Sequence, residues 1–249
     1  MTLDEAVPDL PPRHELSRTP AGRPVFAFRA AGKAATNWWQ RLRAAHPETG
    51  LWPVLMDDDT PEYLAEAREH PNPSYLLHRA GTLDGAATLA ARARAKLEIY
   101  GPELAAEIQA ELRGEGEWPT EPVRRDLGLP FTWRREPRPV TVALVPAVAG
   151  WQVPAVLAYG GWNDHPSPSE HGAILRHWQR RYGIELMTMT GTTVELMVDR
   201  PPTTRPEALA AAWDYWAYND GAADLYDADG VTKLAASLLG APLWLAWWD

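Results

Sequence analysis

The chain has 249 residues, 45% of them hydrophobic, with 13 tryptophans, no cysteine and a formal net charge of −9. The lack of cysteine excludes disulfides, thiolate catalysis and cysteine-ligated zinc. The acidic balance argues against a nucleic-acid partner, and no apolar run reaches the ~20 residues that span a bilayer. The sequence after Met1 has no basic, apolar leader, so we expect a soluble, cytoplasmic protein without membrane contact.

The N-terminal half is predicted to be an α/β unit over residues 24–113, behind a disordered lead-in at residues 1–23. The lead-in holds four prolines among charged residues, which favours disorder. The expected elements are strands at 25–28 and 51–56, and helices at 35–46, from Thr60-Pro61, and within 83–113 on either side of Gly101-Pro102. Residues 114–139 are rich in proline and are predicted to be a linker.

The C-terminal half, residues 140–249, is predicted to form a ferredoxin-like sheet domain. The expected elements are a strand at 153–159, a helix from Ser167 to Tyr182, a hairpin of strands at 184–190 and 193–199, a helix from Thr204, a short helix at 231–239 and a strand at 243–248. Ser167 with Glu170, and Thr204 with Glu207, have the spacing of capping boxes. This element order is that of the split βαβ fold, so the predicted class is α+β.

The last strand, Leu243 to Trp248, is apolar on both faces. A sheet edge of this kind would be an aggregation hazard. We therefore expect Trp244, Trp247 and Trp248 to be largely buried, with strand neighbours on both sides, one of them from residues 153–159. The N-terminal half is then expected to cover this strand or to extend the sheet past it.

Several short motifs follow one another in the C-terminal half: Val153-Pro154-Ala155, Gly160-Gly161-Trp162-Asn163, residues 178–183, Glu195, Arg200-Pro201-Pro202-Thr203-Thr204, Ala208-Leu209-Ala210, Tyr218, Asp220 and Trp247-Trp248-Asp249. With these motifs the segment resembles the bacterial family called domain of unknown function 4253. Residues 50–54 resemble a motif that precedes the domain in longer members. The resemblance implies no established activity. Family members often carry cysteine near the positions of His165 and Asn219, and this chain has none there.

The loop Trp162-Asn163-Asp164-His165 is the strongest candidate for a binding site. It lies between an expected strand and an expected helix, where backbone N–H groups favour anions, and it offers an indole, an amide, a carboxylate and an imidazole. The alternative is a structural turn, because Asn and Asp close turns and Trp162 can anchor the loop. Glu195, Tyr218 and Asp220 are the further candidate binding residues. His171 lies on the apolar stripe of its helix and is interpreted as a core histidine.

No complete catalytic or metal-binding set is found in the sequence. The aspartates between Asp214 and Asp229 do not fit the spacing of a calcium loop. Met197 occupies the position two residues after Glu195 at which a metal-dependent nuclease carries lysine. The chain also lacks a phosphate-binding glycine loop, a dinucleotide fingerprint and a nucleophile elbow, so no cofactor is expected.

These observations favour a non-enzymatic protein that binds a protein partner, of which a toxin-neutralising protein is one form. Residues 140–249 hold twelve acidic and six basic residues, so a basic partner is expected. The alternative hypothesis is a small-molecule enzyme, such as a hydrolase, with His165 as the base and Asp164 orienting it.

Overall fold

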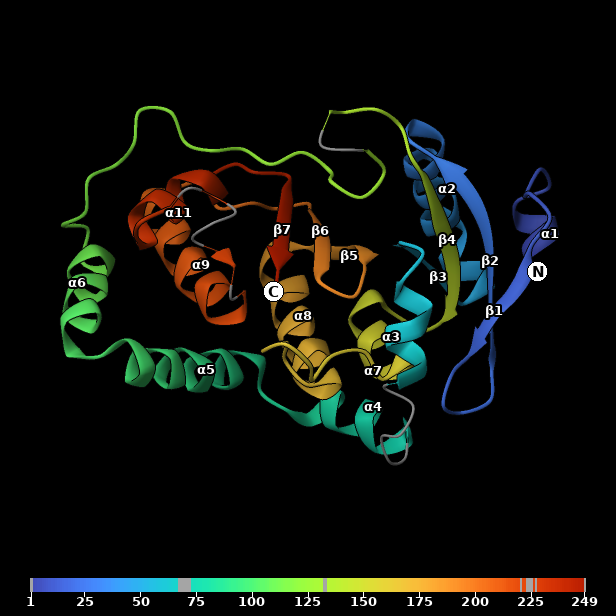
Figure 1. The fold of residues 1–249 in the computed structure, drawn as a ribbon, viewed down its shortest axis with the longest axis horizontal. Coiled ribbons are helices and arrows are strands. Elements are labelled where there is room, and N and C mark those ends of the chain that lie inside the picture. The colour runs from blue at the N-terminus through green and yellow to red at the C-terminus, as the bar shows by residue number, and fades with distance from the viewer. Residues whose placement is uncertain are drawn as a thin grey trace.

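One seven-stranded sheet runs through both halves of the chain, in the order β1-β2-β4-β3-β5-β6-β7 (Figure 1). The computed structural model describes residues 2–66, 73–131, 134–219, 221–222, 226 and 228–248. The strands are β1 (His14–Arg18), β2 (Pro24–Ala31), β3 (Leu51–Met56), β4 (Pro139–Pro146), β5 (Ile184–Met189), β6 (Thr193–Val198) and β7 (Leu243–Trp247). Neighbouring strands are antiparallel except for β3 and β5, which run parallel. The fold class is therefore α+β.

The helices are α1 (Leu3–Ala6), α2 (Lys33–Thr49), α3 (Thr60–Glu66), α4 (Pro73–Thr82), α5 (Gly85–Tyr100), α6 (Pro102–Leu112), α7 (Val153–Leu157), α8 (Pro168–Tyr182), α9 (Arg205–Tyr218) and α11 (Val231–Leu238). The helices α2, α3, α5, α6, α8, α9 and α11 lie where the sequence predicted helices. Both predicted capping boxes are present, at the starts of α8 and α9. Gly50 and Gly183 end α2 and α8 in the left-handed conformation. None of the helices in the described part of the chain is long and apolar enough to cross a membrane.

Two hydrophobic cores lie on opposite faces of the sheet. The larger core contains Trp178 of α8, Tyr215 of α9 and Trp244 of β7, and α5, α7, α8, α9 and α11 contribute to it. The smaller core packs Trp39 and Leu42 of α2 against the other face of β2, β3 and β4. Figure 1 shows α2 apart from the helices of the larger core.

The ferredoxin-like arrangement is not confirmed, because two elements differ from the prediction. Residues 153–157 form helix α7 instead of a strand, with Pro154 in its first turn, the helical position that proline favours. The first strand of the C-terminal half is instead β4, at residues 139–146. Strand β3 of the N-terminal half lies between β4 and β5, so the C-terminal strands do not form a sheet of their own.

Residues 2–23, expected to be disordered, contain α1 and β1, and β1 pairs with β2. The described part of the predicted linker runs between α6 and β4 as a segment that we call the strap, residues 114–131 and 134–138 (Figure 1).

Strand β7 is mostly buried, but among the described residues it has one strand neighbour and not the two that were predicted. It pairs with β6 alone and ends the sheet. Trp244 and Trp248 are 0% exposed, while Trp247 is half-buried. Side chains and one backbone amide take the place of the missing strand: the Tyr226 hydroxyl accepts from Leu245 N (3.1 Å), Asn219 Oδ1 accepts from Trp247 N (2.9 Å) and Gly221 N donates to Trp247 O (3.0 Å). The Tyr215 hydroxyl donates to Leu245 O. These bonds satisfy backbone groups that would otherwise be free for pairing with another chain.

Candidate functional site

The predicted loop is a tight turn built from residues with positive φ. Asn163 and Asp164 have φ values of 44° and 59°, and His165 N donates to Trp162 O over 2.8 Å. Positive φ at both central residues is the requirement of a type I′ turn, for which Asn and Asp are favoured. The turn leaves the side chains of Asn163 and Asp164 exposed.

The two aromatic members of the loop point inward. Trp162 Nε1 donates to Gly191 O at 2.8 Å, which ties the loop to the β5–β6 turn, and its ring stacks on Tyr63. His165 is 5% exposed and stacks on Trp248, with ring centroids 4.1 Å apart. No described hydrogen bond joins Asp164 to His165, and the Asp164 carbonyl accepts from Arg92 instead.

His165 belongs to a buried group of rings that we call the aromatic cluster: Tyr159, Trp162, His165, His171, Tyr218 and Trp248. His171 is 0% exposed, and its Nδ1 lies 2.9 Å from the Tyr218 hydroxyl. The rings of His165 and His171 are 5.8 Å apart. The cluster brings together the loop, α8, α9 and the C-terminal segment.

Burial keeps both imidazoles of the cluster neutral. Desolvation, and then the nearby charge of Arg92, lowers the pKa of His165 to about 3. The pKa of His171 is lowered well below its ordinary value, first by burial and then by His165 and Arg92. A general base works best with a pKa near the operating pH. The contacts and pKa of His165 therefore do not support it as the base of a hydrolase.

The predicted site residues are brought together only in part. Trp162, His165 and Tyr218 meet in the aromatic cluster, whereas Asn163 and Asp164 point to solvent. Asp220 lies outside the described residues. Glu195 projects from the other face of β6, away from the larger core, which contains its neighbours Val194 and Leu196.

Glu195 attaches the strap to the sheet. Its carboxylate is 0% exposed, and Oε1 accepts from the backbone N–H groups of Gly128 and Leu129 in the strap. Burial raises the pKa of Glu195, while the hydrogen bonds from Gly128 and Leu129 and the charge of Arg138 oppose this shift. Two backbone donors aimed at one buried carboxylate fix the position of the strap over β6.

The free energy of unfolding of the wild type is expected to fall as the pH rises and buried Glu195 ionises. Glu195→Gln is expected to abolish this fall. The folded-state pKa of Glu195 is raised, so the folded chain binds more protons than the unfolded chain above about pH 4. Stability from this group is full below the unfolded pKa and is lost as the pH rises through the folded pKa. Urea unfolding of the variant between about pH 4 and 8 should show a free-energy gain over wild type that grows with pH, by ~1.4 kcal/mol for each unit by which the pKa is raised. Glu98→Gln, on the exposed side of α5, is the control, and an equal pH profile for both variants would contradict the prediction.

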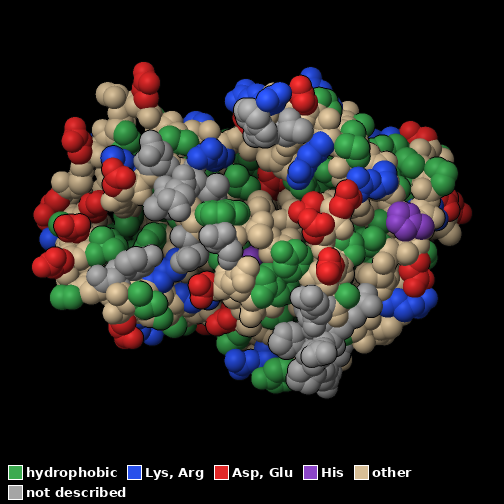
Figure 2. All heavy atoms as spheres, in the orientation of Figure 1, with side chains coloured by type: hydrophobic (Ala, Val, Ile, Leu, Met, Phe, Trp, Pro, Cys, Tyr) green, Lys and Arg blue, Asp and Glu red, His purple; other side chains and the backbone are tan. Residues whose placement is uncertain are grey.

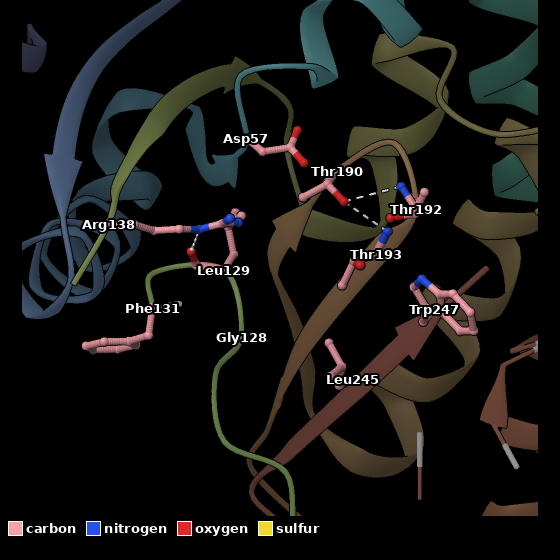
Figure 3. A pocket seen from close by; sticks show the side chains of 10 residues that line it. All are labelled: Asp57, Gly128, Leu129, Phe131, Arg138, Thr190, Thr192, Thr193, Leu245 and Trp247. Atoms are coloured by element: carbon pink, nitrogen blue, oxygen red, sulfur yellow. Dashed lines mark hydrogen bonds between the residues drawn. The ribbon is translucent and has the colours of Figure 1, made fainter. Parts of the chain in front are cut away.

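A pocket that sequence reasoning missed opens beside the strap (Figure 3). It has a volume of about 430 Å³, within the usual range for ligand sites. Four parts of the chain line it: Asp57 after β3, Thr190, Thr192 and Thr193 at the β5–β6 turn, Leu245 and Trp247 of β7, and Gly128, Leu129, Phe131 and Arg138 of the strap. We call it the strap pocket. It collects residues that lie far apart in the sequence, so no local motif could have indicated it.

No group of three His, Asp or Glu side chains among the described residues could hold a metal ion.

Comparison with known proteins supports the resemblance of the C-terminal half. No curated protein matches the chain, and no solved structure matches it. The family whose model matches is described as "Domain of unknown function (DUF4253)", and the match covers residues 141–249, from β4 onward. It thus includes the aromatic cluster, Glu195 and β7. Residues 141–249 are therefore similar to the DUF4253 family.

Proposed function

We propose that this protein is a non-enzymatic binding protein whose partner is a basic protein. The observation that carries the proposal is an acidic surface on α6 and the segments next to it, which we call the acidic arm, residues 98–121. Its charged residues are Glu98, Glu103, Glu107, Glu111, Glu115, Glu117 and Glu121 against the single Arg113. Acidic side chains gather at this end of the molecule (Figure 2). A surface of one charge sign speeds association with a partner of the opposite sign.

The acidic arm is largely free of internal ion pairs. Glu111 accepts from Thr232 N and Glu115 pairs with Arg113. The other five glutamates of the arm are exposed, and none forms an ion pair with a described residue. Their charges are therefore available to a partner.

Part of the acidic excess of residues 140–249, which first suggested a basic partner, forms contacts within the fold. Glu170 and Glu207 close capping boxes, Glu185 pairs with Arg43, and Asp214 lies 3.6 Å from Arg181. The proposal therefore moves the binding face from the C-terminal half to the acidic arm.

Neutralising the arm is expected to abolish capture of the partner. The variant carries Glu98→Gln, Glu103→Gln, Glu107→Gln and Glu117→Gln, and its matched control carries Glu48→Gln, Asp59→Asn, Glu62→Gln and Asp199→Asn elsewhere on the surface. Both lose the same charge, so a general charge effect would appear in both. In affinity capture from host lysate at low salt, wild type and control should retain a basic protein, and the arm variant should retain at least ~10-fold less. Capture should also weaken as salt is raised.

Equal capture by the arm variant and its control would show that the arm is not the binding face, and the absence of any captured protein would oppose the proposal itself. A toxin-neutralising role is one specific form of the proposal, in which the captured partner is a toxin. In that form, wild type but not the arm variant should protect cells that express the partner.

A further inference from the structure

The strap pocket contains two opposite charges, from segments that the fold brings to one hollow. Arg138, at the end of the strap, and Asp57, just after β3, both line it. The strands β3 and β5 run parallel, and Asp57 and Thr190 directly follow their carboxyl ends. Ligands of open α/β sheets commonly bind outside the carboxyl ends of parallel strands.

The Arg138 guanidinium is held at the pocket wall by one of its nitrogens. Its Nε donates to Leu129 O at 2.5 Å, and the group projects toward the hollow (Figure 3). No described carboxylate lies within ion-pair distance of it. Its two terminal nitrogens are therefore available, and a planar guanidinium suits a carboxylate that binds through both oxygens.

Asp57 presents one carboxylate oxygen to the same hollow. Its Oδ1 accepts from the backbone N–H of Thr60 at 3.0 Å and from the Thr60 hydroxyl. These bonds fix the orientation of the carboxylate and leave Oδ2 without a described hydrogen bond. This arrangement suits an ammonium group, which needs oxygen acceptors.

The rest of the pocket is mainly apolar. Leu245 and the half-buried Trp247 line the side of the hollow opposite Arg138 and Asp57 (Figure 3). Gly221 packs closely against the Trp247 indole, since a Cβ added there would lie 2.3 Å from Trp247 Cε3. An aromatic wall of this kind adds apolar contact area for a ligand side chain.

We propose that the strap pocket binds a free α-amino acid with an apolar side chain. The carboxylate would bind Arg138, the ammonium Asp57, and the side chain the wall of Trp247 and Leu245. A multiply charged anion such as a nucleotide fits poorly, because a carboxylate stands at the same wall as the single guanidinium. The proposal is independent of the acidic arm, whose residues do not line this pocket.

Calorimetric titration with three related probes tests each contact separately. L-phenylalanine carries both charges, 3-phenylpropanoate lacks the ammonium and 2-phenylethylamine lacks the carboxylate. Phenylalanine is expected to bind at least ~10-fold more tightly than either of the other two, because each loses one charged hydrogen bond. The other apolar L-amino acids are titrated alongside to find the preferred side chain.

Two variants test which side chain binds each charged group of the amino acid. Asp57→Asn keeps an acceptor for Thr60 and should weaken phenylalanine by at least ~10-fold while leaving 3-phenylpropanoate within ~3-fold of wild type. Arg138→Gln should weaken phenylalanine and 3-phenylpropanoate but not 2-phenylethylamine, and Arg138→Lys should restore part of the loss. If Arg138→Gln does not fold, Asp57→Asn alone decides the result. The arm-neutralised variant should bind amino acids as wild type does, so this test and the partner test can fail separately. No binding of any apolar amino acid at ~10 mM, or equal binding by wild type and Asp57→Asn, would overturn the proposal.

Discussion

A chain that ends at Leu243 is expected to be insoluble or unfolded. The deletion removes Trp244 and Trp248, both 0% exposed. Replacing one such tryptophan by alanine typically costs ~3–5 kcal/mol, and the whole stability of a domain is ~5–15 kcal/mol. The pairing of β7 with β6 and the bonds that seal its outer edge are lost as well.

The expected loss of stability is large because three other aromatic rings pack against Trp244. Its centroid lies 5.4 Å from that of Trp178, 5.1 Å from Tyr182 and 5.7 Å from Tyr215. Far-UV circular dichroism and thermal melting of the truncated chain provide the measurement. Trp244→Ala should lose far more stability than Trp247→Ala, since Trp247 is only half-buried. A soluble truncated chain that melts cooperatively would show that β7 is an appended segment.

Gly160→Ala is expected to destabilise the protein by about 2–5 kcal/mol, much more than Gly161→Ala. Both glycines have positive φ, 107° and 90°, so both alanines carry a backbone penalty of ~1–2 kcal/mol. The two positions differ in the space available for the added Cβ. A Cβ at Gly160 would lie 2.4 Å from Pro166 O and 2.7 Å from His171 Cδ2, whereas a Cβ at Gly161 meets nothing within 4 Å. Gly160 thus allows the loop to close over the buried His171.

Thermal melts of the two variants separate the backbone penalty of positive φ from the steric clash of the added Cβ. In a chain of this length, 1 kcal/mol corresponds to a change of ~2–4 °C in Tm, so the two alanines should be clearly resolved. Equal losses for both would mean that only the backbone angle matters at Gly160. Gly161→Ala should also leave the near-UV signal of the aromatic cluster unchanged, and Gly160→Ala should alter it.

The sequence by itself determined the elements whose signals are local. The capping boxes that start α8 and α9, the glycines that end α2 and α8, and the break at Gly101-Pro102 all lie where the sequence placed them. Each depends on hydrogen bonds or backbone angles within about five residues. The burial of Trp244 and Trp248 was also predictable, because an apolar C-terminal strand has to be covered.

Only the tertiary structure decided the order of the strands and the composition of the candidate sites. Residues 153–157 are buried on every side, so they have no apolar periodicity that separates a helix from a strand. The insertion of β3 between β4 and β5 depends on pairing between distant segments, as does the sealing of β7 by Tyr226 and Asn219. For the same reason the placement of Arg138 beside Asp57 was invisible in the sequence, where about eighty residues separate them. Local bonds leave a pattern in neighbouring residues, whereas packing between remote segments is fixed only when the whole core forms.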